Sequence, residues 1–153
     1  MRHATVAIVA AVVAASVPAS CSDSKPAGYC DVAKQVVGAQ TALDEQMNGN
    51  TPPAPAQFEA AVTAYLDHVR RLRDIAPATI RHDMDGVLTS FTAFDSAMSK
   101  VGYDFRTLMN DPAAAKAAAD EMSVMQTTEI KASMDKVDQY TQTTCGFNLD
   151  SSN

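Results

Sequence analysis

The sequence lacks the short motifs that mark the commonest enzyme and cofactor sites. It has no glycine-rich phosphate loop, no serine nucleophile elbow, no His-Glu-x-x-His zinc motif and no Cys-x-x-Cys-His haem attachment sequence. No nucleophile and base, and no pair of carboxylates, can be assigned to a common site. We therefore expect a protein that is not an enzyme and that needs no cofactor.

Positively charged residues are also few. The chain has 12 Lys and Arg residues against 18 Asp and Glu residues, which gives a formal net charge of −6. Contacts to phosphates need clustered positive charge. The only basic cluster, Arg70-Arg71 with Arg73, has Asp67 and Asp74 beside it. The sequence thus argues against nucleic acid as a partner and against direct binding of anionic lipid head groups.

Tryptophan is absent and only 6% of the residues are aromatic, so the core must be built largely from aliphatic residues and alanine. No segment shows the alternation of apolar and polar residues that marks a strand. Apolar residues instead recur at steps of three and four in four long segments: Val32, Val36, Leu43, Met47; Phe58, Val62, Tyr65, Val69, Leu72; Ile80, Met84, Val87, Phe91, Phe94, Met98, Val101; and Ile130, Met134, Val137, Thr141. The pattern predicts an all-α, up-down four-helix-bundle-like domain.

Local signals separate these segments. Breaks are expected at Asn48-Gly49-Asn50, Ala76-Pro77 and Gly102. Asp111-Pro112 is a helix start, because it supplies a capping side chain and then a proline at the first helical position. We expect a short helix or turn over residues 103–109. The last segment is longer than its neighbours, so a bend or break is expected near Asp120.

The first 20 residues have the layout of a secretory signal peptide. A short positive start, Met1-Arg2-His3, precedes an uncharged and mostly apolar run over residues 4–17. This run is shorter than the roughly 20 apolar residues that span a bilayer. Residues 1–20 are therefore expected to be removed on export, and a retained N-terminal anchor helix is the minor alternative.

Two cleavage sites compete at the end of this segment. Val17-Pro18-Ala19 fits ordinary signal peptidase, whereas Ala19-Ser20-Cys21 fits the end of a bacterial lipobox, although Pro18 stands where a leucine is usual. In the second case Cys21 is acylated and becomes the first residue. We expect a lipoprotein anchored through Cys21 to the outer face of the cell membrane, with a freely secreted protein as the alternative.

The cysteine count supports this assignment. Three cysteines cannot all pair within one chain. Cys30 opens the first helical segment and Cys145 closes the last. After four antiparallel helices the chain returns to the end where it began, which allows the Cα separation of about 5.5 Å that a disulfide needs. We predict a Cys30–Cys145 disulfide and a lipid on Cys21. The alternative pairs Cys21 with Cys30 and leaves Cys145 free or in a dimer.

These assignments divide the chain into four parts. Residues 1–20 are the signal peptide, residues 21–29 a flexible tether, residues 30–146 the helical domain, and residues 147–153 a disordered tail. The tether would hold the domain just off the membrane surface.

Two histidines and a methionine form a candidate metal site. His68 precedes the Ala76-Pro77 break, and His82 and Met84 follow it. If the two helices pack antiparallel, these side chains lie near one corner and could hold copper or iron, since soft thioether ligands select Cu(I). The alternative is a pair of solvated or core histidines.

Methionine is frequent in the chain. Beyond Met1, the positions are Met47, Met84, Met98, Met109, Met122, Met125 and Met134. Several fall on predicted core positions, where methionine fills irregular gaps. Methionine-lined grooves also suit apolar ligands. The sequence therefore favours a non-enzymatic binding or scaffolding module whose partner is an envelope protein or an apolar ligand. A metal-handling bundle is the alternative.

Several of these features occur together in a known group of proteins. They are Cys30-Asp31, Ala76-Pro77 with Ile80 and Asp83, and Tyr140 with Cys145-Gly146. In this outline the chain resembles small Ala-rich exported helical proteins of actinobacteria, generally labelled lipoproteins or secreted proteins of unknown function. The resemblance implies export and a helical fold, and it implies no activity.

Overall fold

The computed structural model describes residues 28–149, and all regular structure in this part of the chain is helical. The elements are α1 (Tyr29–Met47), α2 (Pro55–Ile75), α3 (Ala78–Lys100), α4 (Phe105–Asn110), α5 (Pro112–Met122), the 3-10 turn η1 (Ser123–Gln126) and α6 (Thr128–Cys145). No helix within 28–149 is long and apolar enough to cross a membrane. The expected signal peptide, most of the tether and Cys21 lie outside the described residues.

The helix boundaries follow from local chemistry. Pro77 lies two residues beyond Ile75, so it ends α2, and it is the N-cap residue of α3. The Asp111 carboxylate accepts hydrogen bonds from the backbone N–H groups of Ala113 and Ala114, at 2.9 and 3.1 Å, which caps α5 as its sequence predicted. The expected short helix is α4, which begins after the capping side chain of Asp104.

The last long segment is interrupted close to the position that the sequence suggested. The break is the turn η1, a few residues beyond Asp120. The hydroxyl of Thr127 accepts a hydrogen bond from the N–H of Ile130, at 3.3 Å, and so caps a new helix in place of continuing the old one. The described part of the chain thus has six helices where the sequence predicted four long ones and one short element.

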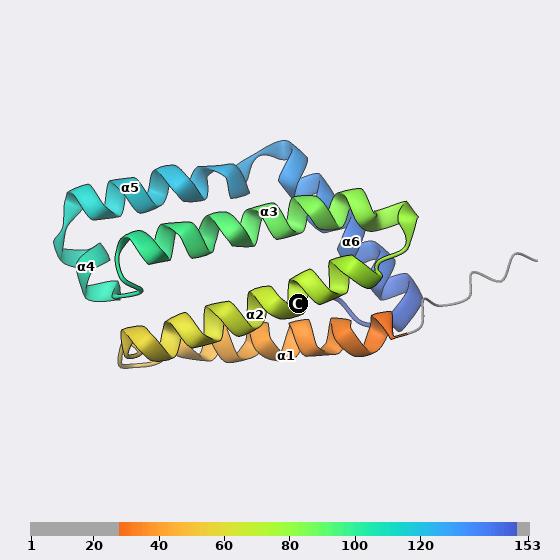
Figure 1. The fold of residues 1–153 in the computed structure, drawn as a ribbon, viewed down its shortest axis with the longest axis horizontal. Helices are drawn as coiled ribbons and strands as arrows, with labels where there is room; N and C mark the ends of the chain where they lie inside the picture. Colours follow the sequence, from red (N-terminus) through yellow and green to blue (C-terminus); the bar gives the residue numbers. More distant parts are fainter. Residues whose placement is uncertain (1–27, 150–153) are drawn as a thin grey trace, which may run out of the picture.

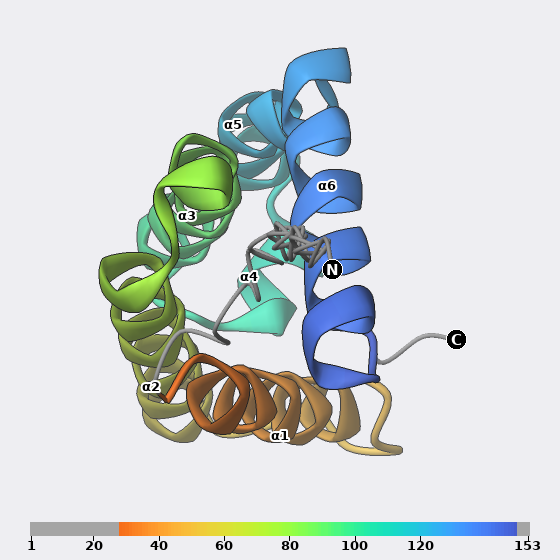
Figure 2. The ribbon, with the colours of Figure 1, turned by 90° about the vertical axis from the view of Figure 1, so that its right-hand side faces the viewer.

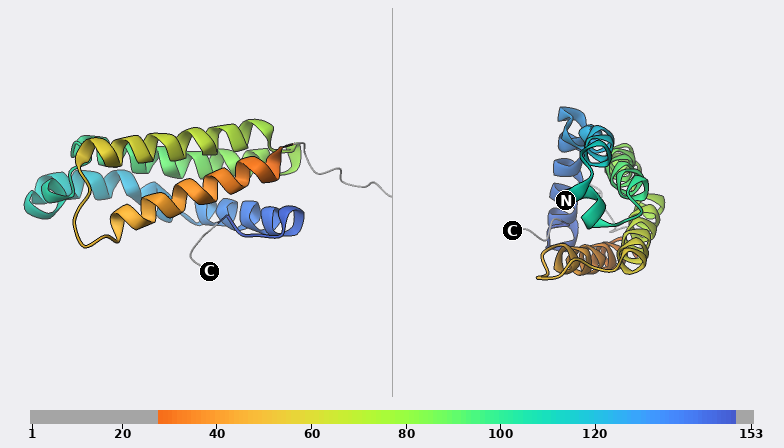
Figure 3. Two further views of the ribbon diagram at one scale, coloured as in Figure 1. Left: turned by 90° about the horizontal axis from the view of Figure 1, so that it is seen from below. Right: turned by 90° about the vertical axis from the view of Figure 1, so that its left-hand side faces the viewer.

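The helices enclose a common core, and their order around it follows the chain. α1 packs along α2, α2 along α3, and α3 along both α5 and α6 (Figure 1). The short helix α4 closes one end of the molecule, beside the end of α3 and the start of α5 (Figure 3). The same arrangement brings the end of α6 back to the beginning of α1.

Helix α6 crosses the others steeply. Figure 2 looks along the molecule, so that α1, α2 and α3 are seen nearly end-on while α6 is seen lengthwise. α6 packs closely on α3 but contacts α1 only slightly. A Cβ atom added to Gly86 of α3 would meet the Ser133 side chain of α6 at 2.9 Å, so the glycine permits this close crossing. Beside it, Lys136 of α6 donates to the buried carboxylate of Asp83 at 3.0 Å.

An aromatic cluster packs at the end of the molecule that α4 closes. The Phe58 ring of α2 is completely buried. It makes edge-to-face contacts with Phe105 of α4 and Phe94 of α3, with centroid separations of 4.8 and 6.4 Å. Phe58 therefore joins three helices through one side chain.

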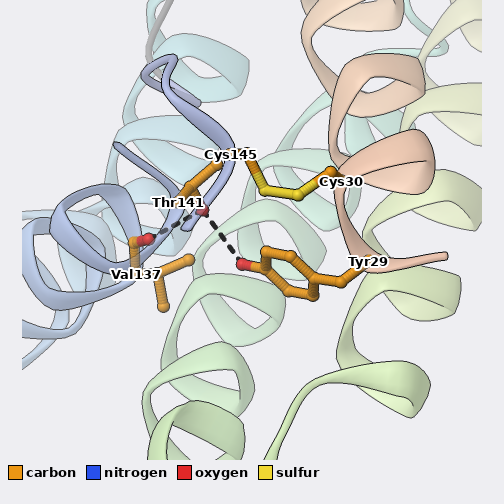
Figure 4. The surroundings of a disulfide bond; sticks show 5 residues. All are labelled: Tyr29, Cys30, Val137, Thr141 and Cys145. Carbon is orange, nitrogen blue, oxygen red and sulfur yellow. Dashed lines mark hydrogen bonds between the residues drawn. A yellow bond between two sulfur atoms is a disulfide. The ribbon is translucent and has the colours of Figure 1, made fainter. Parts of the chain in front are cut away.

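The predicted disulfide is present at the corner where the chain returns to its start. Cys30 and Cys145 are bonded, with their Cα atoms 5.5 Å apart (Figure 4). Next to the bond, the buried hydroxyl of Thr141 donates to the carbonyl of Val137, at 2.9 Å. Thr141 has only one hydroxyl proton, so the Tyr29 hydroxyl must be the donor in the 3.0 Å bond between Tyr29 and Thr141. A covalent bond and a buried polar pair thus fasten α1 to α6.

This corner gives the protein a distinct alkaline pH dependence. Burial raises the pKa of the Tyr29 phenol from 10.0 to about 12. Between these values the unfolded chain loses this proton while the folded chain retains it. The free energy of unfolding therefore falls as pH rises from 10 towards 12, by about 2 to 3 kcal/mol. We expect Tyr29→Phe to remove this part of the decline.

Urea titrations of the wild type and Tyr29→Phe at pH 8, 10 and 12 measure the difference. Burial and the hydrogen bond to Asp95 also raise the pKa of Tyr103 to about 12, so a decline of the same kind must persist in the single variant. Parallel curves for wild type and Tyr29→Phe across this range would contradict the assignment to Tyr29.

Candidate functional site

Two adjoining cavities run between α1 and the segment formed by η1 and α6. The first has a volume of about 290 Å³ and the second about 180 Å³. Both are lined by Gln40 of α1, Tyr65 of α2 and Phe91 of α3, so they are parts of one depression. We refer to this depression as the α1–α6 groove. The groove exists because α6 crosses α1 steeply and approaches it only near the disulfide, so the rest of α6 lies away from α1.

The floor of the groove comes from α2 and α3. It consists of Val62, Tyr65, Leu66, Val69 and Leu72 from α2, and Met84, Val87, Phe91 and Phe94 from α3. The rings of Tyr65 and Phe91 meet edge to face with their centroids 4.7 Å apart. An apolar floor of this kind excludes water from whatever lies on it, and it is typical of small-molecule sites.

The walls carry methionines and carboxylates. Met47 projects from the end of α1, Met125 from η1 and Met134 from α6. The polar side chains of the lining are Gln40 and Asp44 on α1, with Asp135 and Asp138 on α6. Flexible thioethers can adapt to ligands of different shape.

The chain beyond α6 closes one end of the groove. Gly146, with φ of 82°, ends α6. Leu149 then lines the larger cavity, and its backbone N–H donates to the Asp138 carboxylate at 2.7 Å. Phe147 and Leu149 are both half-buried against the core. The sequence placed these residues in the tail and gave no signal for this contact, since only the fold brings Asp138 next to Leu149.

The groove explains why some predicted core residues are not buried. Most positions of the apolar stripes are buried as expected. The residues that escape burial are Met47, Phe91, Phe94 and Met134, and all four line the groove. Met47 retains 43% of its surface exposed. The helical pattern identified these side chains correctly as facing inward, but the neighbouring helices leave them partly uncovered.

The candidate metal residues are spread over different environments. His68 of α2 is half-buried, with its Nδ1 atom lacking a hydrogen-bond partner. On α3, His82 is exposed while Met84 is completely buried in the groove floor. Over the range that the structure describes, no group of three or more His, Cys, Asp or Glu side chains could hold a metal ion. No observation therefore favours the metal-handling alternative.

Comparison with known proteins identified no relative of this chain. No family model, no curated protein and no solved structure matches the chain. The groove and the residues that line it are therefore the basis for the function proposed below.

Proposed function

We propose that this protein is a non-enzymatic binding module whose α1–α6 groove takes up a small apolar or amphipathic molecule. The observation that carries the proposal is the incomplete burial of Met47, Phe91, Phe94 and Met134 along one continuous depression. Protein cores are normally close-packed, and each square ångström of apolar surface left in water forgoes about 25 cal/mol. A ligand in the groove would recover this free energy.

The size of the groove supports a small ligand. Its larger cavity, about 290 Å³, is close to the lower end of the roughly 300–1,000 Å³ typical of small-molecule sites. In this proposal α1, α2, α3 and the interrupted segment of α5, η1 and α6 are the four arms of an up-down bundle. The last arm is bent away from the first, and the bend leaves room for the ligand.

We further propose that the module works outside the cell, held to the outer face of the membrane by a lipid on Cys21. This part of the proposal rests on the signal-like layout of residues 1–20. The Cys30–Cys145 disulfide supports it, because such bonds persist in oxidising compartments. The alternative is a freely secreted protein. The intact mass of the protein from its own host distinguishes an acylated Cys21 from an unmodified one.

Binding of the neutral fluorophore N-phenyl-1-naphthylamine tests the groove directly. Gln40→Trp places a bulky side chain where the two cavities meet. Gln35→Trp is the matched control, because Gln35 is exposed on the same helix and lines neither cavity. We expect saturable binding to the wild type and to Gln35→Trp, and at least about tenfold weaker binding to Gln40→Trp.

The comparison is valid when circular dichroism shows the same helix content and melting temperature for both variants. Equal binding by Gln40→Trp and Gln35→Trp would place the fluorophore elsewhere on the protein. Absence of binding to the wild type would remove the proposed function.

A further inference from the structure

We propose that the ligand of the α1–α6 groove is an amphipathic organic cation, a molecule with an apolar body and one ammonium or guanidinium group. This inference rests on the proposed function, because it names the chemical class of ligand for the same groove. It follows from the charges along the walls and from the aromatic rings of the floor.

All the charged side chains that line the groove are carboxylates. Asp135 and Asp138 line the larger cavity and Asp44 the smaller one, and the lining of both cavities contains no Lys, Arg or His. Among the ion pairs formed within residues 28–149, none includes Asp135 or Asp138. The adjacent cation on α6, Lys136, donates instead to Asp83 of α3. The negative charges of Asp135 and Asp138 are therefore not balanced by an ion pair within residues 28–149.

The position of the carboxylates matches the shape of an amphipathic molecule. Asp135 is exposed while Met134, the preceding residue, is half-buried in the groove. A ligand lying on the apolar floor would contact Met134 with its apolar body and Asp135 with its cationic group. Asp138 accepts a hydrogen bond from the N–H of Leu149 through Oδ1, and a carboxylate has further acceptor capacity beyond one such bond.

The floor favours a cation over an anion of the same length. Tyr65 and Phe91 present aromatic rings within the groove. Organic cations are attracted to the faces of such rings, with quaternary ammonium groups as the best-known ligands. A fatty acid would place its carboxylate beside Asp135 and Asp138, where like charges repel. The net charge of −6 on the whole chain acts in the same direction.

Displacement of N-phenyl-1-naphthylamine by three ligands of equal chain length tests this inference. The competitors are dodecyltrimethylammonium, dodecanol and dodecanoate, each at pH 8. The two ionic competitors are kept below the concentration at which micelles form, and dodecanol below its solubility limit. We expect the cation to bind about tenfold more tightly than the anion at low salt, and this preference to shrink in 1 M NaCl.

A pair of charge variants locates the effect. Asp135→Asn removes one carboxylate from the groove wall, and Asp31→Asn removes one from an exposed position in the first turn of α1 outside the lining. Both raise the net charge by one unit. We expect the preference for the cation to fall about threefold in Asp135→Asn and to stay unchanged in Asp31→Asn.

The outcomes separate this inference from the proposed function. Equal binding of the three competitors would overturn the inference while the groove remains a binding site for apolar molecules. Tighter binding of dodecanoate would also overturn it, as would an equal response of the two charge variants. Failure of the wild type to bind the fluorophore and all three competitors would overturn both proposals.

Discussion

Removal of the Cys30–Cys145 bond is expected to lower the free energy of unfolding by about 5 kcal/mol. The bond joins positions 115 residues apart, and in the chain-entropy model a loop of this size restricts the unfolded chain by about that amount. For a domain of this length the change corresponds to a fall of about 15–20 °C in Tm. Thermal melts of wild type and Cys30→Ala/Cys145→Ala measure it.

The single variant Cys21→Ala is the control for this experiment. Cys21 lies outside the described residues, and both other cysteines of the chain are taken up by the Cys30–Cys145 bond. We expect Cys21→Ala to melt at the wild-type temperature. If the free energy of unfolding of the double variant lay within about 1 kcal/mol of the wild-type value, packing alone would hold α1 against α6.

Truncation of Phe58 to alanine is expected to lower the free energy of unfolding by about 3–5 kcal/mol. The ring is fully buried and contacts both Phe94 and Phe105, so its loss leaves a cavity where α2, α3 and α4 meet. Chemical denaturation measures the loss. Amide hydrogen exchange of α4 provides a second measurement, because this short helix has no buried residue of its own and depends on its neighbours.

Phe94→Ala is the matched control for this variant. The Phe94 ring touches the same cluster but is half-buried and faces the groove. Less packing is lost there, so we expect a smaller cost than for Phe58→Ala, and we expect exchange in α4 to change less. Equal costs for the two variants would mean that Phe58 is not the anchor of this end of the molecule.

Helix boundaries could be predicted from the sequence because their signals are local. Proline at position 77 ends one helix wherever the chain folds, and the Asp111-Pro112 pair starts another. The disulfide could also be predicted, since an even number of long antiparallel segments returns the chain to its start. A break near Asp120 could be predicted from the length of the segment, but its position at η1 could not. Thr127 competes with helix continuation through its side chain, and its neighbouring sequence gives only a weak signal.

The groove could not be predicted in the same way. A helical pattern tells which side chains point inward, but whether another helix covers them depends on crossing angles. The close approach at Gly86 and Ser133 permits α6 to cross α3 as it does, and this long-range contact leaves no periodic trace in the sequence. The helical pattern therefore predicted Phe91 and Met134 as core residues, whereas in the structure both line a cavity.

The central claim, that the α1–α6 groove binds an amphipathic cation, is tested most directly by methyl NMR of the methionines. Met47, Met84, Met125 and Met134 line the groove, whereas Met98 is buried outside it and Met109 is exposed on α4. Titration with dodecyltrimethylammonium should shift the first four methyl resonances in parallel, with one dissociation constant, and leave the last two in place. Shifts confined to Met109, or equal shifts at all six, would contradict the claim.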